Sequence, residues 1–184
     1  MITRSRFTIL FNQTFFIFVI QLFGFFEKIK TCFVELDKNN RSNASFVIDY
    51  QSDRTILIHH EKRSYVILKN IEAKAYYLSS MNNGWEKVIN PLLNLVVSQN
   101  AKLFYQPGTF QLQINGRIID KLIEKTEAIL VNKEEAQILT NSSRTATIKT
   151  LLNKMFKRGT KIAVITDGAN GSYSYYDGKY YFLD

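Results

Sequence analysis

Two polar turns, each preceded by an apolar run, carry the side chains best suited to chemistry in this chain. The first begins at Asn132 and has Glu135 three positions later, and the second spans 166–171 with the sequence TDGANG. Ligands of open α/β sheets bind outside the carboxyl ends of the strands, where such turns lie. The two turns are therefore candidate parts of one ligand site.

The first turn combines an amide with a carboxylate. These groups suit a hydrated Mg²⁺ and the phosphates that it bridges, because Mg²⁺ prefers oxygen ligands and keeps several waters. The same spacing fits a helix N-terminus, with Asn132 as the N-cap and Glu135 completing a capping box. Taken alone, the pattern favours the capping interpretation, since such pairs are common at helix starts.

The second turn places Gly168 and Gly171 three residues apart after an apolar run. Glycine permits positive φ and close backbone approach, so successive N–H groups can surround a phosphate. Thr166 could donate its hydroxyl to that phosphate, and Asp167 lies in the same turn. The alternative is a strand-to-strand turn that needs its glycines only for geometry.

The elements that position these turns alternate between strands and helices. We expect strands at 73–80, 101–105, 127–132 and 161–166, and helices at 85–96, 114–125, 134–139 and 147–157. Pro91 should kink the first helix or mark a late start, and Gly159 should cap the last one. Two aromatic strands, 172–176 and 179–183, should turn at Asp177-Gly178. The alternation predicts an α/β domain with a mostly parallel sheet covered on both faces.

A hairpin lies outside this alternation. Residues 45–50 and 54–60 are rich in β-branched and aromatic side chains and are joined by a short polar turn. We expect a small projecting sheet at about 45–60 and the α/β core at about 73–184.

Composition limits the class of protein. The 184 residues are 46% hydrophobic, which suits one globular domain. The net charge is +8, but the basic residues form no long run and no nucleic-acid-binding motif accompanies them, so no nucleic-acid partner is expected. Cys32 is the single cysteine. It cannot form an internal disulfide, which favours a reducing, cytoplasmic setting.

The amino-terminal segment, 1–32, is considered apart from the domain that follows it, because residues 7–26 form an apolar run. Its length suits a membrane-spanning helix or a signal peptide. Asn12, Gln13 and Gln21 interrupt it, and no small-residue cleavage site follows. We favour a buried helix or a poorly specified terminal segment, so a membrane partner is expected only if residues 7–26 insert.

Together and in this order, the motifs resemble the PfkB (ribokinase-like) carbohydrate kinase family from about residue 33 to residue 184. VNKEEAQIL (131–139) resembles the family's Asn-x-x-Glu motif, and ITDGANGSYSY (165–175) resembles its Thr-x-Gly-x-x-Gly phosphate turn. FYQPGTFQL (104–112) resembles its Asn-Pro-Gly segment, and residues 41–58 resemble the lid strands that close over the sugar. The resemblance implies a ribokinase-like three-layer α/β/α fold with a small β lid.

The resemblance also implies ATP and Mg²⁺ as cofactors and a sugar or nucleoside as substrate. Family members transfer the γ-phosphoryl group of ATP to a substrate hydroxyl by positioning, charge stabilisation and a general base. Glu135 would hold Mg²⁺ through water. The residues expected to contact the nucleotide are Asn132, Thr166, Asp167, Gly168 and Gly171.

The sequence departs from the family in several places. The Gly-Ala-Gly-Asp segment that supplies the catalytic base is expected beyond Asp184, so no catalytic residue is assigned. The glycine-rich sugar motifs are absent from 1–31, Gln106 replaces Asn, and residues 59–62 replace a typical Arg-Gly-Ala-Asn stretch. We therefore expect an incomplete kinase domain, truncated at both ends and inactive alone, as a fragment, a split gene or a decayed copy.

Two alternatives remain open. One is a non-catalytic module that keeps the scaffold for nucleotide binding or for homodimerisation through the lid strands. The other is a small membrane-anchored protein, which rests on residues 7–26 alone. The sequence does not identify the sugar, because Ser79, Ser80 and the lid would form only part of its wall.

Overall fold

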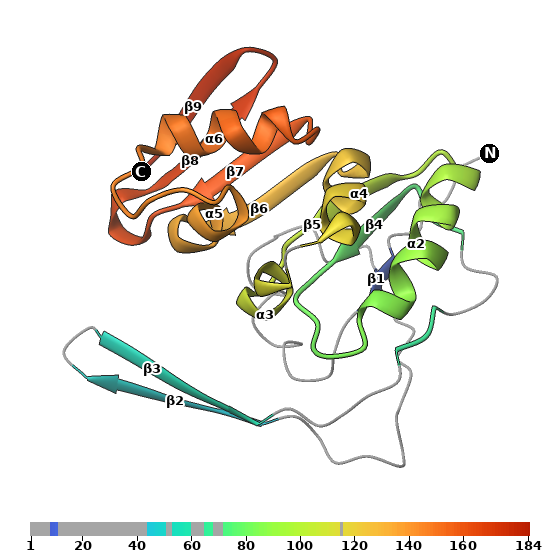
Figure 1. Ribbon diagram of the computed structural model, residues 1–184, viewed down its shortest axis with the longest axis horizontal. Helices are drawn as coiled ribbons and strands as arrows, with labels where there is room; N and C mark the ends of the chain where they lie inside the picture. Colours follow the sequence, from blue (N-terminus) through green and yellow to red (C-terminus); the bar gives the residue numbers. More distant parts are fainter. Residues whose placement is uncertain (1–7, 11–43, 51–52, 60–64, 68–71, 115) are drawn as a thin grey trace, which may run out of the picture. The chain divides into compact units, whose positions relative to one another are not determined.

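The computed structural model describes residues 8–10, 44–50, 53–59, 65–67, 72–114 and 116–184 (Figure 1). Contacts divide the chain into two compact units, one of residues 1–10, 65–81 and 85–184 and one of residues 11–64 and 82–84. The first unit holds the large sheet. Its strands are β1 (Thr8–Leu10), β4 (Ala75–Leu78), β5 (Lys102–Tyr105), β6 (Ala128–Asn132), β7 (Ile162–Thr166), β8 (Ser172–Tyr176) and β9 (Lys179–Leu183).

Among the described residues, the sheet has seven strands in the order β1-β4-β5-β6-β7-β8-β9. Pairing is parallel from β1 to β7 and antiparallel from β7 to β9. The predicted mostly parallel α/β sheet is therefore confirmed. The sequence did not predict β1, which lies inside the apolar amino-terminal run, and the helix considered for the rest of that run falls outside the described residues.

The helices are α2 (Glu86–Ser98), α3 (Thr109–Gln113), α4 (Arg117–Lys125), α5 (Lys133–Leu139) and α6 (Ile148–Lys157). Pro91 lies inside α2, so the alternative of a late helix start at this proline is wrong. Gly159 follows the last turn of α6 with φ +110, as expected for a C-terminal glycine. Of the helices in the described residues, α3 is the one that the sequence missed.

The core of this unit lies between the sheet and its helices. Alternate side chains of the central strands are almost fully buried: Tyr76, Leu78, Leu103, Tyr105, Ile129, Val131, Ala163 and Ile165. Leu92, Leu122 and Leu151, one each from α2, α4 and α6, have no exposed surface. Burying a side chain of this size stabilises the fold by roughly 1.5–3 kcal/mol. The strand ends are thus held in place by packing along the whole sheet.

The β8–β9 hairpin turns where the sequence predicted. Asp177 and Gly178 have φ values of 49° and 76°, the two positive φ angles that a type I′ turn requires. The rings of Tyr175 and Tyr180 contact each other across the strands in a tilted arrangement, with centroids 4.8 Å apart. The Tyr180 hydroxyl also donates to Asn153 Oδ1 of α6 at 2.6 Å. The hairpin is therefore fixed to α6 as well as to β7.

The second unit contains the hairpin of β2 (Ala44–Tyr50) and β3 (Asp53–His59), which pair antiparallel. This confirms the predicted hairpin, although its turn residues, 51–52, lie outside the described residues. No helix in the part of the chain that the structure describes is long and apolar enough to span a membrane.

Candidate functional site

The carboxyl ends of β6 and β7 bring the two polar turns together. Asn132 and Thr166 are the last register partners of these parallel strands, and both are exposed. Neighbouring strands lie about 4.8 Å apart. The turns predicted from the sequence therefore form one continuous polar edge.

The first turn is a capping box. The Asn132 Oδ1 atom accepts a hydrogen bond from the Glu135 backbone N–H at 2.8 Å, and the Asn132 backbone N–H donates to Glu135 Oε2 at 2.9 Å. The capping interpretation is thus confirmed. It uses one polar atom of each side chain, and within the described residues Asn132 Nδ2 and Glu135 Oε1 have no hydrogen-bond partner.

The environment of Glu135 is unfavourable for its charge. Burial raises the pKa of this carboxyl group, and the neighbouring charge of Glu134 adds to the increase, while the hydrogen bond from Asn132 opposes it. Because burial and a like charge disfavour the ionised form, a cation placed beside this carboxylate would stabilise it. A hydrated Mg²⁺ would supply one, so the side chain fits the metal role that the family resemblance implies.

The second turn is closed by its own backbone. Gly168–Asn170 form the short 3-10 helix η2, and the Asp167 backbone N–H donates to the Gly171 carbonyl at 2.9 Å. Gly168 and Gly171 have φ values of +54° and +85°, a region that favours glycine.

The two glycines of this turn have different surroundings. A Cβ on Gly171 would lie 2.4 Å from the Leu183 carbonyl oxygen of β9, so packing requires glycine there. A Cβ on Gly168 would meet nothing within 4 Å. The alternative of a turn that needs glycine only for its geometry therefore accounts fully for Gly171. Gly168, by contrast, adjoins open space that a ligand can enter.

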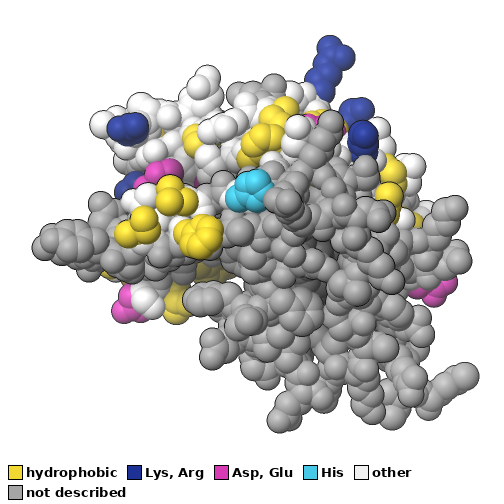
Figure 2. Space-filling model, turned by 90° about the horizontal axis from the view of Figure 1, so that it is seen from below, with side chains coloured by type: hydrophobic (Ala, Val, Ile, Leu, Met, Phe, Trp, Pro, Cys, Tyr) yellow, Lys and Arg dark blue, Asp and Glu magenta, His cyan; other side chains and the backbone are white. Residues whose placement is uncertain are grey.

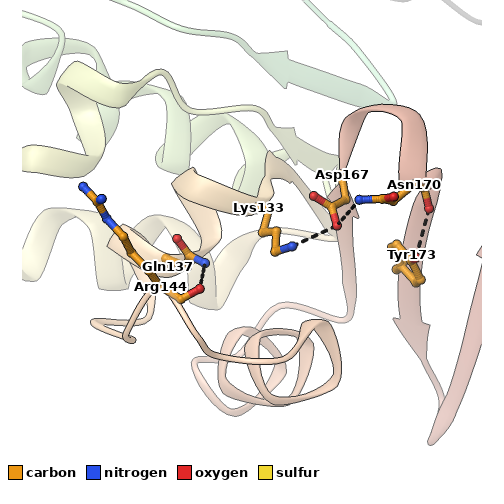
Figure 3. A network of polar contacts seen from close by, with 6 residues as sticks. All are labelled: Lys133, Gln137, Arg144, Asp167, Asn170 and Tyr173. Atoms are coloured by element: carbon orange, nitrogen blue, oxygen red, sulfur yellow. Dashed lines mark hydrogen bonds and ion pairs between the residues drawn. The ribbon is translucent and has the colours of Figure 1, made fainter.

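An ion pair that the sequence did not reveal connects the two turns (Figure 3). The Lys133 ammonium lies 3.0 Å from Asp167 Oδ2, which also accepts a hydrogen bond from Asn170 Nδ2 at 3.2 Å. Lys133 chiefly, and Asn170 secondarily, hold the pKa of Asp167 below its usual value. The sequence held one indication of this ion pair, because Lys133 is the one basic residue in the two turns.

A second link joins the loops that follow β4 and β5. Gln111 is fully buried, and its Oε1 accepts hydrogen bonds from the Gly108 N–H at 3.0 Å and the Met81 N–H at 3.1 Å. Gly108 packs so closely on Ser80 that a Cβ would lie 2.1 Å from the serine Oγ. The sequence singled out Ser80 but missed Gln111, which holds these loops together.

Comparison with known families identifies the chain. Residues 27–183 match the family described as pfkB family carbohydrate kinase. The chain therefore belongs to the pfkB family, as its motifs indicated. None of the curated proteins searched matches it.

Solved structures share the fold. A PfkB protein from Polaromonas sp. JS666 superposes with a TM-score of 0.55 at 13% identity, covering 78% of this chain and 53% of that one. A candidate ribokinase II from E. coli in complex with ATP and Mg²⁺ gives 0.55 at 12% identity, with 78% and 50% covered. A Burkholderia thailandensis nucleoside kinase in complex with inosine gives 0.54 at 14% identity, with 77% and 46% covered.

The chain thus spans about half the length of these structures. At such low identity the likeness establishes the ribokinase-like α/β fold alone, and the family match over residues 27–183 establishes membership of the pfkB family.

The raised pKa of Glu135 leads to a prediction about stability. The folded state binds this proton more tightly than the unfolded state, so wild type should lose stability relative to Glu135→Gln as pH rises through the interval from the ordinary to the raised pKa. The expected loss is about 1.4 kcal/mol for each pH unit by which the pKa is raised. Urea unfolding of both proteins between about pH 3 and pH 8 measures the difference and also covers the acidic interval of the control below.

The control is Glu127→Gln, which should show the opposite sign. Lys161, Lys102 and their hydrogen bonds lower the pKa of Glu127, so wild type should lose stability relative to this variant as pH falls. The same pH trend in both variants would contradict the environment assigned to Glu135.

Proposed function

We propose that this chain provides the nucleotide-binding part of an ATP-dependent sugar or nucleoside kinase. The observation that carries the proposal is the register of β6 and β7, which pairs Asn132 with Thr166 and so joins two motifs separated by 33 residues of sequence. Membership of the pfkB family supports the reaction class.

Each group at the edge has a role suited to its chemistry. The turn at Gly168 receives the terminal phosphates, because its backbone can be approached without a Cβ obstructing. The Thr166 hydroxyl donates to the same phosphates. Asn132 orients Glu135, and the carboxylate holds Mg²⁺ through water. When bound, Mg²⁺ offsets the negative charge of the phosphates.

The chain has no Gly-Ala-Gly-Asp sequence, so the proposal assigns no general base within it. These 184 residues are expected to bind Mg-ATP without transferring its phosphate. A cytoplasmic location, where ATP is present and Cys32 stays reduced, fits this function.

The proposal predicts that Mg-ATP raises the thermal unfolding midpoint of the chain. A ligand at 100 times its Kd stabilises the folded state by about 2.7 kcal/mol. Gly168→Ala should weaken Mg-ATP binding at least tenfold, because its methyl group occupies the open space at the turn and its positive φ is strained. Isothermal titration calorimetry measures the affinity.

Gly178→Ala is the matched control. Gly178 also has a positive φ, +76°, with nothing within 4 Å of a Cβ, but it lies in the β8–β9 turn. It should bear the same backbone strain and keep wild-type affinity. The absence of any wild-type shift at millimolar Mg-ATP would refute the proposed function.

A second candidate function, homodimerisation through the β2–β3 hairpin, is favoured by its exposed apolar face. Phe46, Ile48 and Leu57 are 67%, 54% and 55% exposed. Phe46 pairs with Leu57 and Ile48 with Thr55, so these side chains share one face. Figure 2 shows apolar side chains, in yellow, gathered at the surface beside a histidine side chain, in cyan. An isolated two-stranded hairpin is marginally stable, so a partner surface would stabilise it.

The dimer hypothesis predicts that Phe46→Lys with Leu57→Lys converts a dimer to a monomer, because two charges then face the partner's apolar surface. Sedimentation velocity at tens of micromolar, a concentration well above a micromolar Kd, measures this. Val97→Lys is the control, since Val97 is 64% exposed on α2. A monomeric wild type, or equal dissociation by Val97→Lys, would contradict the hypothesis.

A further inference from the structure

The charge balance of the two turns is unusual for a surface that binds phosphate. Residues 132–135 and 166–171 contain three carboxylates, Glu134, Glu135 and Asp167, and one basic side chain, Lys133. A polyphosphate would meet net repulsion from these fixed charges. Mg²⁺ offsets part of that repulsion, and Lys133 is the one cation that the turns themselves supply.

Lys133 is held where it can face a ligand at either turn. It is the first residue of α5, and its ammonium reaches across to Asp167 beside the Gly168 turn (Figure 3). A lysine ammonium has three N–H donors. Asp167 accepts one of them, and among the described residues no other group bonds to the ammonium. The side chain remains 31% exposed.

Arg144, in the loop that follows α5, carries a cation that is arranged differently. Its backbone carbonyl accepts a hydrogen bond from Gln137 Nε2 at 3.2 Å, while its guanidinium points away from Asp167 in Figure 3. The guanidinium has no hydrogen bond or ion pair within the described residues. Arg144 therefore carries a positive charge that is not directed towards Asp167.

A purely structural ion pair is the competing explanation for Lys133. Partly exposed ion pairs contribute little to stability, because solvent screens them and ordering the side chains costs entropy. Asp167 gains neutralisation from Lys133 in either case. The two explanations differ in whether Lys133 still contributes to phosphate affinity once the charge of Asp167 has been removed.

We propose that Lys133 is a phosphate-binding residue of this site, which donates to the terminal phosphates of the nucleotide while Asp167 anchors its ammonium. The proposal rests on the proposed function and deepens it, since it adds a cation to the phosphate contacts of the two turns. Charge-assisted hydrogen bonds of this type are the stronger class.

The test measures the affinities for Mg-ATP and for inorganic tripolyphosphate by isothermal titration calorimetry. Lys133→Met should weaken both ligands at least tenfold, as expected for a lost charge-assisted hydrogen bond, and Lys133→Arg should keep the affinity within about threefold. Arg144→Met removes the same charge and should change affinity less than about twofold, because that cation points away. Circular dichroism of each variant verifies folding.

The decisive comparison uses Asp167→Asn, which removes the carboxylate charge but keeps an oxygen acceptor for Lys133. In this background too, Lys133→Met should lower the affinity for both ligands at least tenfold. If Lys133→Met no longer lowered the affinity in this background, the proposal would be overturned, since Lys133 would then serve only to neutralise Asp167. Lysine-dependent binding of tripolyphosphate without Mg-ATP binding would refute the proposed function and the nucleotide as ligand, but would retain Lys133 as a phosphate-binding residue. Binding of neither ligand by wild type would refute both.

Discussion

The register between β6 and β7 is the constraint on which the site depends. Five residue pairs, from Ala128 with Ile162 to Asn132 with Thr166, fix one strand against the other. Slipping a strand by one residue would move its buried side chains to the opposite face. Val131 and Ile165, 3% and 0% exposed, immediately precede the polar pair and prevent that slip. The hydrophobic core therefore sets the alignment of the two turns.

The structural roles at this edge are compatible with the proposed ligand-binding roles, because Asn132 and Glu135 each have a second polar side-chain atom. The capping box uses one oxygen of Glu135 and starts α5, which leaves the second oxygen for a ligand. The glycine turn divides its roles between residues instead. Gly171 is required by β9, and Gly168 leaves space above the turn. A local motif that stabilises the fold is thus compatible with a site that binds phosphate.

Much of this architecture could be predicted from the sequence, because alternating apolar strands and amphipathic helices have recognisable periods. The β8–β9 turn was equally clear from Asp177-Gly178. The three residues of β1 and the five of α3 were missed, since neither is long enough to show a period. The Lys133–Asp167 pair was missed for another reason: the partners lie 34 residues apart and meet only through strand register. Gln111 likewise acts across the loops of two strands.

The most direct test of one shared phosphate site is a Mg-ATP titration of the ¹⁵N-labelled chain followed by backbone amide chemical shifts. The account predicts that amides of residues 132–135 and 166–171 shift together and fit a single Kd, while those of the β2–β3 hairpin do not follow them. Shifts confined to one turn, or different Kd values for the two turns, would contradict the claim that β6 and β7 build a single site.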